Sequence, residues 1–327
     1  MSVGAGAEAD AAVVWRDGVH VAGTVLWCDA RRARSVCFVS SADRLGRAGH
    51  GQLVGTRETL AQVRATPAER LVVPYHRPFT LGTVRLELAP SGHAVGAAML
   101  TTDVGGCRIT YAGCVAPDGV GLGGAAAARP CDVLVVEARY GLREHAFPTA
   151  TAAATALADW AREVCAGGAA AVVLVSSASK GLDVAARLAA DGVVSAGHRA
   201  LHDAARALRA AGAAVPALRG QVAAAGRALI WPMRDRRGLA RAVATVPHRR
   251  ALASGLAREP ACARARRRRR LRLVQRRRSR SPAGVRARHR RQRDPPHRPL
   301  RRGGPRRARP PARVLAPPRQ LALWGGA

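Results

Sequence analysis

The sequence predicts a mixed α/β protein with a basic tail, and three observations lead to this. Short apolar runs separated by glycine-rich turns fill the first 140 residues, as expected of β-strands. From residue 149 the apolar positions repeat at helical spacing. From residue 171 a buried strand, a small-residue turn and a helix follow one another, the order typical of an α/β sheet.

The first 140 residues contain the predicted strands and one short helix. Asp17-Gly18 predicts a hairpin turn between strands 12–15 and 19–21. Residues 58–63 have helical spacing. The other expected strands are 24–28, 35–39, 71–73, 83–88, 97–101, 107–112 and 133–136. Because most of them are apolar throughout rather than alternating, we expect sheets that are covered on both faces.

The next hundred residues alternate between helix and strand. A helix is predicted over 149–166, a strand over 171–175, helices over 182–190 and 200–211, and an edge strand over 228–231. The turn at 176–181, Ser-Ser-Ala-Ser-Lys-Gly, precedes a helix, and a helix N-terminus can receive an anion. Lys180 in this turn is therefore either a phosphate ligand or, more simply, a solvated lysine.

The positive charge is concentrated at the end of the chain. The formal net charge is +33, and most of the excess lies after about residue 232. Residues 257–327 contain runs of arginine, almost no acids and no apolar periodicity. Such a segment buries too little apolar surface to offset its ordering entropy, so it is predicted to be disordered. The sequence therefore divides into a domain over 12–256 and a tail over 257–327.

Two interpretations of the tail stay open. Arginines without interleaved aromatic residues can bind nucleic acid through its phosphates, without sequence preference. Alternatively, much of residues 263–312 is translated out of frame. Residues 288–299 can be back-translated so that the adjacent frame encodes a plausible strand and turn.

Cysteine usage and the apolar segments predict a cytoplasmic protein. The odd number of cysteines and the absence of a CxxC pair argue against a disulfide framework, so we expect buried, reduced thiols. The first twelve residues do not resemble a signal peptide, and no segment has the roughly 18 to 20 apolar residues of a membrane span. The cysteines are Cys28, Cys37, Cys107, Cys114, Cys131, Cys165 and Cys262.

The most informative motif is a histidine in a glycine-bracketed turn. Residues 91–98 read Ser-Gly-His-Ala-Val-Gly-Ala-Ala and contain His93. Two strand-like segments follow, one closing on Ala-Gly-Cys at Cys114 and one on Glu-Ala-Arg-Tyr-Gly from Glu137. Upstream, Val-Ser-Ser-Ala-Asp-Arg-Leu-Gly-Arg contains Asp43 and Arg44. In this order the motifs resemble those of metallo-β-lactamase-fold nucleases, in the branch of β-CASP RNA-processing proteins and DNA-ligase-associated exonucleases.

The resemblance covers roughly residues 12–230 and implies a fold, a cofactor and a reaction. The fold would be an αββα sandwich that holds two zinc ions between its sheets. The ions would generate hydroxide for the attack on a phosphodiester of RNA or single-stranded DNA. Asp43, His93 and Cys114 would be metal ligands, with Cys114 where the family has a bridging aspartate. Asp43 and Glu137 would serve in catalysis.

The sequence departs from the family pattern at several of these positions. Family members typically have Ser-His-Ala-His-x-Asp-His where this chain has lost two histidines and carries Arg44 in place of the last one. The final histidine motif, expected near 265–290, is absent, and Lys180 and His198 match less specific family positions. Two or three ligands remain where a two-metal site needs five or more. Catalysis is therefore expected to be impaired or lost.

Three functions are compatible with the sequence: a metal-dependent nuclease, a pseudoenzyme that only binds nucleic acid or a partner, and the product of a damaged reading frame. Simpler roles also stay open for the individual residues. His93 could be an ordinary turn histidine and Asp43 a solvated loop acid, and Glu137 could pair with a nearby arginine, Arg139 or Arg143. The remaining histidines of this part, His50, His76 and His145, are expected at the surface or in turns.

Overall fold

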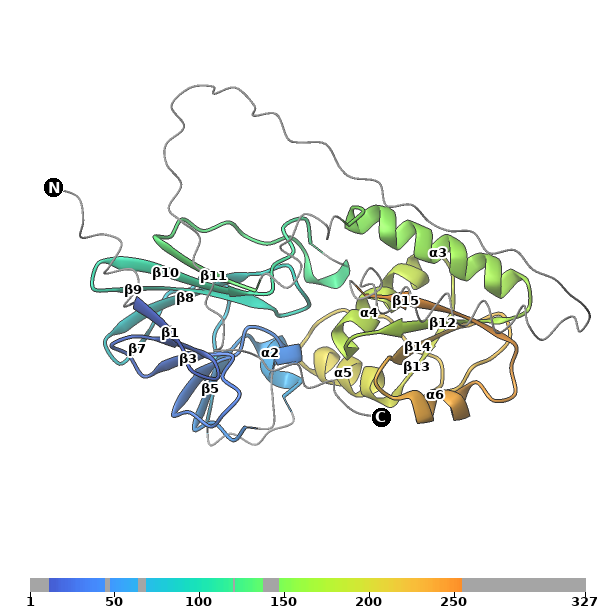
Figure 1. The fold of residues 1–327 in the computed structure, drawn as a ribbon, viewed down its shortest axis with the longest axis horizontal. Helices are drawn as coiled ribbons and strands as arrows, with labels where there is room; N and C mark the ends of the chain where they lie inside the picture. The colour runs from blue at the N-terminus through green and yellow to red at the C-terminus, as the bar shows by residue number, and fades with distance from the viewer. Residues whose placement is uncertain (1–11, 45–47, 64–68, 120, 138–146, 255–327) are drawn as a thin grey trace, which may run out of the picture. The chain divides into compact units, whose positions relative to one another are not determined.

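The computed structural model describes residues 12–44, 48–63, 69–119, 121–137 and 147–254 (Figure 1). Over these residues the chain forms three β-sheets and five α-helices, which confirms the predicted mixed α/β class. All of the described residues belong to one compact unit. The predicted tail, the proposed out-of-frame segment, His145 and Cys262 lie outside the described residues.

The first sheet has six short strands in sequence order. Its first three strands are antiparallel and the later ones are parallel. The predicted hairpin is confirmed, with Asp17 in the left-handed region at φ 58°. Two short helices, η1 (Ala42–Arg44) and α2 (Arg57–Ala61), follow the fourth and fifth strands. The strands are β1 (Val13–Trp15), β2 (Val19–Val21), β3 (Leu26–Cys28), β4 (Val36–Phe38), β5 (Gln52–Gly55) and β6 (Glu69–Val72).

The second sheet has five strands in the order β11-β10-β9-β8-β7. The strands are antiparallel except for the parallel pair β10 and β11. That pair shifts register between Tyr111 and Gly113, just before Cys114. The strands are β7 (Phe79–Leu81), β8 (Val84–Pro90), β9 (Ala98–Val104), β10 (Cys107–Gly113) and β11 (Val133–Val136), with the short helix η2 (Gly121–Gly123) before β11.

Helix α2 and the first two sheets form three successive layers. Cys37 and Leu53 face α2 and pack with Leu60 in one buried cluster. Phe38 points to the opposite side of the same sheet, where its ring meets Tyr111 of β10 edge to face at 6.3 Å. The first sheet is therefore covered on both faces, as its apolar runs predicted.

The third sheet is parallel and has the order β13-β14-β12-β15. Apolar residues alternate across its central strand, so that one face packs on α3 and α4 and the other on α6 (Figure 1). The strands are β12 (Ala170–Val175), β13 (Ser195–Gly197), β14 (Ala228–Pro232) and β15 (His248–Ala253). The helices are α3 (Ala150–Ala166), α4 (Ala178–Ala190), α5 (Arg199–Ala210) and α6 (Arg236–Ala242).

Several sequence expectations for this region are corrected. Residues 228–231 were expected to form an edge strand, but β14 lies inside the sheet between β13 and β12. The reason is that β15, which the sequence analysis missed, adds the edge beyond β12. Helix α4 begins at Ala178 rather than at 182, because Ser177 caps it. Strands β5, β7 and β13 and helix α6 were also missed.

Burial of the cysteines and histidines follows the expectations in part. Cys28 and Cys37 are buried, and the other described cysteines are partly buried and free. Burial raises the pKa of the Cys37 thiol to about 12. His76 lies in a turn with φ 60°, as expected, but His50 is buried rather than at the surface. Within the described ranges no helix is both long and apolar enough to cross a membrane.

Candidate functional site

The loop that carries Asp43 and Arg44 is anchored by a buried aspartate. Asp29 follows β3 in the left-handed conformation, at φ 46°. Its carboxylate accepts hydrogen bonds from the Ser40 amide at 2.8 Å, the Ser40 hydroxyl at 2.5 Å and the Tyr111 hydroxyl at 2.8 Å. Burial raises the pKa of Asp29 by more than these hydrogen bonds lower it. The start of the loop is therefore fixed to both of the first two sheets.

The turn that carries His93 is fixed by its glycines and by α2. Gly92 has φ +72°, and a Cβ there would lie 2.2 Å from the carbonyl oxygen of Ala116, so no larger residue fits. The hydroxyls of Thr56 and Thr59 donate to the carbonyl oxygen of Gly96 at 2.6 and 2.8 Å. The His93 ring is thus held on a rigid turn rather than on a mobile loop.

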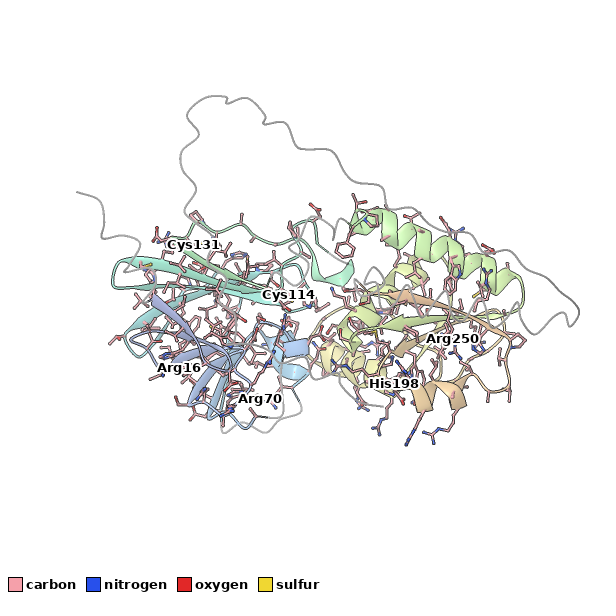
Figure 2. All side chains as sticks on the ribbon, viewed as in Figure 1. Arg16, Arg70, Cys114, Cys131, His198 and Arg250 are labelled. Carbon is pink, nitrogen blue, oxygen red and sulfur yellow. The ribbon has the colours of Figure 1, made fainter. Side chains whose placement is uncertain are left out.

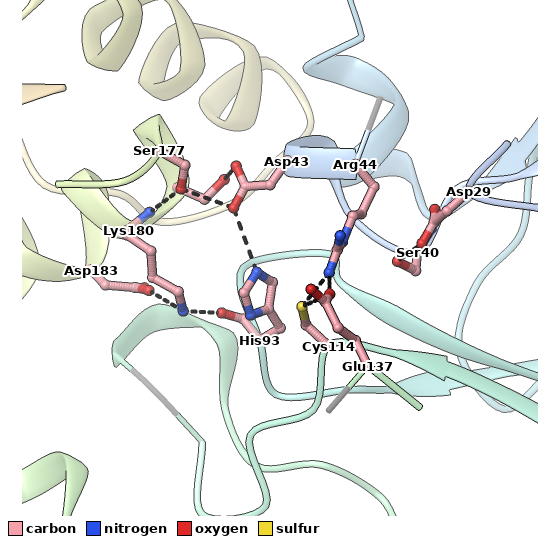
Figure 3. Close-up of polar contacts among 11 residues, drawn as sticks. Asp29, Ser40, Asp43, Arg44, His93, Cys114, Glu137, Ser177, Lys180 and Asp183 are labelled. Atoms are coloured by element: carbon pink, nitrogen blue, oxygen red, sulfur yellow. Dashed lines mark hydrogen bonds and ion pairs between the residues drawn. The ribbon is translucent and has the colours of Figure 1, made fainter. Parts of the chain in front are cut away.

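Asp43 lies between His93 and the first turn of α4 (Figure 3). Its two carboxylate oxygens accept hydrogen bonds from Ser177 and Ser179, both at 2.9 Å, and its Oδ2 lies 3.5 Å from the His93 Nε2. Burial alone would raise the pKa of Asp43, but the hydrogen bonds from His93 and the two serines outweigh it and hold the pKa below its ordinary value. The expectation of a solvated loop acid is therefore wrong.

Lys180 is part of the same cluster. Its Nζ donates to the backbone carbonyl of His93 and lies 3.4 Å from the Oδ2 of Asp183. The simpler expectation, a solvated lysine, is therefore corrected: two partners from different segments hold the ammonium group. Burial raises the pKa of Asp183, and the charge of Lys180 opposes that shift.

Arg44 points away from Asp43 into a second cluster (Figure 3). Its Nη2 donates to the Cys114 sulfur at 2.7 Å and forms an ion pair with the Glu137 carboxylate. The Cys114 thiol in turn donates to the Glu137 Oε2 at 2.8 Å. Burial alone would lower the pKa of Arg44, but the neighbouring Cys114 and Asp29 outweigh it, so the guanidinium is held firmly charged. Glu137 thus pairs with Arg44, whereas Arg139 and Arg143 lie outside the described residues.

The structure brings the predicted site residues together in two pairs rather than in one group. Asp43 meets His93, whereas Cys114 meets Glu137, with Arg44 between its members. As arranged, these residues do not fit a metal ion: both Asp43 oxygens accept serine hydroxyls, and a guanidinium occupies the space between Cys114 and Glu137. In the part of the chain that the structure describes, no three His, Cys, Asp or Glu side chains form a group that could hold a metal ion.

A cavity of about 570 Å³ adjoins the Asp43 cluster. Its walls come from η1, α2, α4 and α5, and the alanines of α5 form much of its apolar surface. His198 lies at its edge, where its Nδ1 accepts from the amide of Ala200 and its Nε2 lies 3.5 Å from Asp235. Its polar lining residues are Asp43, Gln62, Ser179, His198, Arg199, Asp203 and Arg206.

The sequence analysis missed three residues that position these side chains. Asp29 is an isolated acid after a short strand, and no local pattern distinguishes it from a solvated turn residue. Ser177 and Ser179 could have been found, because serines just before a helix are the expected capping residues. Their partner Asp43 is more than 130 residues away in the sequence and could not be inferred from local patterns.

Comparison with known proteins adds little to this geometry. No protein-family model matches the sequence, and neither does any curated protein. Among solved structures, the chain is similar to a protein of unknown function from Enterococcus faecalis V583, with 12% sequence identity and a TM-score of 0.40. The similarity covers 62% of this chain and 60% of that chain. The functional argument therefore rests on the side chains themselves.

Proposed function

We propose that this protein is a pseudoenzyme on a metallo-β-lactamase-like fold, one that binds RNA or single-stranded DNA without hydrolysing it. Support for the fold comes from the layers formed by α2 and the first two sheets, which correspond to three of the four layers of an αββα sandwich. Further support comes from His93, Cys114 and Glu137, which lie in the turns and strand ends that carry metal ligands and acidic residues in that family.

The observation that carries the proposal is the position of Arg44. In the resemblance this residue replaces a metal-binding histidine, and its guanidinium contacts both Cys114 and Glu137. A fixed positive charge here would repel a divalent ion, and with its side chain 28% exposed it is only partly screened by water. Zinc binding and hydrolysis, expected from the resemblance, are therefore both proposed to be lost.

Nucleic-acid binding is supported by the cavity and by the charge around it. Arg199 and Arg206 line the cavity at the start and middle of α5. Arg206 is paired with Asp203 at 2.7 Å, whereas the guanidinium of Arg199 forms no hydrogen bond or ion pair with another described residue. Arg199 is therefore available to a phosphate, which a guanidinium binds in bidentate geometry.

The parallel-sheet half of the chain is strongly basic even without the tail. Residues 150–253 contain fourteen arginines and lysines against six aspartates and glutamates, an excess of eight positive charges. Figure 2 shows nitrogen-tipped side chains projecting from α6, on the side of the sheet opposite to α3. Such a surface attracts a polyanion over distances comparable with the Debye length.

Fluorescence anisotropy with a labelled single-stranded oligonucleotide tests the proposal on the full-length chain. We expect binding that weakens with salt and an oligonucleotide that stays intact when Mg²⁺, Mn²⁺ or Zn²⁺ is added. The double variant Arg199→Ala, Arg206→Ala should reduce the affinity by about tenfold and the salt slope by about one. The matched control is Arg108→Ala, Arg162→Ala, which removes the same charge from exposed positions of β10 and α3.

Two outcomes would overturn the proposal. Metal-dependent cleavage of the oligonucleotide that disappears in His93→Ala would restore the hydrolase interpretation. Equal binding by the cavity variant and its control would show that the cavity is not the binding site and that the chain attracts nucleic acid by charge alone.

A further inference from the structure

The second cluster contains a cation that belongs to the protein. Arg44, Cys114 and Glu137 come from η1, the end of β10 and the end of β11, and their polar groups converge on one point (Figure 3). The sulfur and the carboxylate each contact the guanidinium, and they also contact each other at 2.8 Å. A thiol and a carboxylate arranged around a shared positive charge are two of the donors that a zinc ion takes.

The charges of this cluster balance without an added ion. The Glu137 carboxylate is neutralised by Arg44, and the Cys114 thiol is satisfied as donor to Glu137 and acceptor from Arg44. The side chains of Arg44 and Glu137 are only 28% and 31% exposed, so water does not fully replace either partner. Loss of the guanidinium would leave the carboxylate and the sulfur without a cation, with Asp29 nearby on the same side.

The neighbouring Asp43 does not contribute to this cluster, although it precedes Arg44 in the chain. Its carboxylate is turned to Ser177 and Ser179 of α4. Consecutive residues of one short helix thus serve two separate clusters, and the guanidinium fills the space in which a metal ion would have to bridge them.

We propose that Arg44 is the resident cation of this site, holding Cys114 and Glu137 in place of a divalent metal ion and excluding such an ion. The site is consequently assembled at all times and does not depend on metal supply. This inference is separate from nucleic-acid binding, because its measurements use metal and stability rather than an oligonucleotide.

Zinc titration of the full-length wild-type chain and of three variants tests the inference. Arg44→His replaces the guanidinium with an imidazole, so that a histidine, a cysteine and a glutamate face one another as potential zinc ligands. We expect this variant to bind about one zinc ion more than the wild type, at about tenfold or higher affinity, and to melt at a higher temperature with zinc than without. Arg44→Lys keeps the charge and should behave as the wild type does, with a melting temperature that neither zinc nor a chelator shifts.

The matched control is Arg44→His combined with Cys114→Ser, which should lose the added zinc. It separates this site from the other free cysteines of the chain. Zinc retention by the wild type after dialysis, at a stoichiometry that falls when Cys114→Ser alone is introduced, would overturn the inference even if the Arg44 variants failed to fold. So would an Arg44→His variant that folds and takes up no more zinc than the wild type.

Discussion

The hydroxyl of Tyr111 donates a hydrogen bond to the Oδ2 of Asp29 at 2.8 Å and thereby joins the first sheet to the second. Asp29 follows β3, and Tyr111 lies on β10. The same carboxylate holds the amide and the hydroxyl of Ser40 at the start of the loop that carries Asp43 and Arg44. One buried carboxylate therefore connects the packing of the two sheets with the geometry of the candidate site.

Tyr111→Phe is expected to destabilise the protein by about 1–2 kcal/mol, because a buried carboxylate oxygen loses a donor and water cannot replace it. The free energy of unfolding in urea measures this effect. The matched control is Tyr75→Phe, whose hydroxyl donates to the carbonyl of Ala97 at 3.0 Å. That carbonyl also accepts from the amide of Ser91, so its loss should be smaller. Equal losses in the two variants would contradict a special role for the Asp29 contact.

Gly113 lets the end of β10 approach the Asp29 loop closely. Its φ is +57°, and a Cβ there would lie 2.6 Å from the Ser40 hydroxyl oxygen and 2.9 Å from the Ser40 Cβ. Gly113→Ala therefore combines backbone strain with a steric clash, and we expect a loss of about 2–4 kcal/mol in the free energy of unfolding.

Gly105→Ala is the control for the Gly113 substitution. Gly105 has the same φ of +57° in the turn between β9 and β10, with nothing within 4 Å of the added Cβ. It should lose only the cost of the left-handed backbone, about 1 kcal/mol. If Gly113→Ala were no worse than Gly105→Ala, the close packing of Ser40 on β10 would not contribute to stability.

Local patterns predicted the elements of this fold better than their neighbours. The turn at Asp17-Gly18 and the helix over 150–166 were predictable because a few adjacent residues determine each of them. Strand β15 was missed because Arg249 and Arg250 make it look polar. An edge strand tolerates such exposed charges, since one side of it faces solvent.

The candidate site was predictable in its residue types and not in its partnerships. Asp43, His93, Cys114 and Glu137 were all identified from their motifs, but the expected single metal group required Asp43 and Cys114 to face each other. The side-chain direction of Arg44 decides between one group and two, and its partner Cys114 is 70 residues away. No periodicity in the sequence reports such a contact.

Stability is expected to fall as the pH drops below neutrality, in part because of His50. This side chain is buried, and its Nδ1 has no hydrogen-bond partner among the described residues. Burial lowers the pKa of His50 below its ordinary value of 6.5, so below that pH the unfolded chain takes up a proton that the folded chain resists. Stability from this group is present above pH 6.5 and is lost as the pH falls toward the folded pKa.

His50→Gln should therefore flatten the dependence of unfolding free energy on pH between about 7.5 and 5.5. The slope should not vanish, because burial also lowers the pKa of His198. Urea titrations at several pH values, on the wild type and the variant, measure the two slopes. Identical slopes would mean that His50 becomes protonated in the folded protein as readily as in the unfolded chain.

Ser177 has two roles that a pair of helix caps can separate. Its hydroxyl accepts from the amide of Lys180 at 3.3 Å, capping α4, and donates to Asp43 at 2.9 Å. Thr149 caps α3 in the same way, accepting from the amide of Ala152 at 3.2 Å. Thr149→Ala should cost about 1 kcal/mol, the usual loss for a cap, whereas Ser177→Ala should cost about 2 kcal/mol because the Asp43 carboxylate also loses a donor.

A double-mutant cycle between Ser177→Ala and Asp43→Asn measures the second role directly. If the contact is formed as described, the two substitutions are coupled by about 0.5–2 kcal/mol, whereas Thr149→Ala and Asp43→Asn should add independently. Since Ser179 still donates to Asp43 in the single variant, the expected result is a weakened rather than a collapsed cluster. Additive losses for Ser177 and Asp43 would show that the loop of Asp43 is positioned without the first turn of α4.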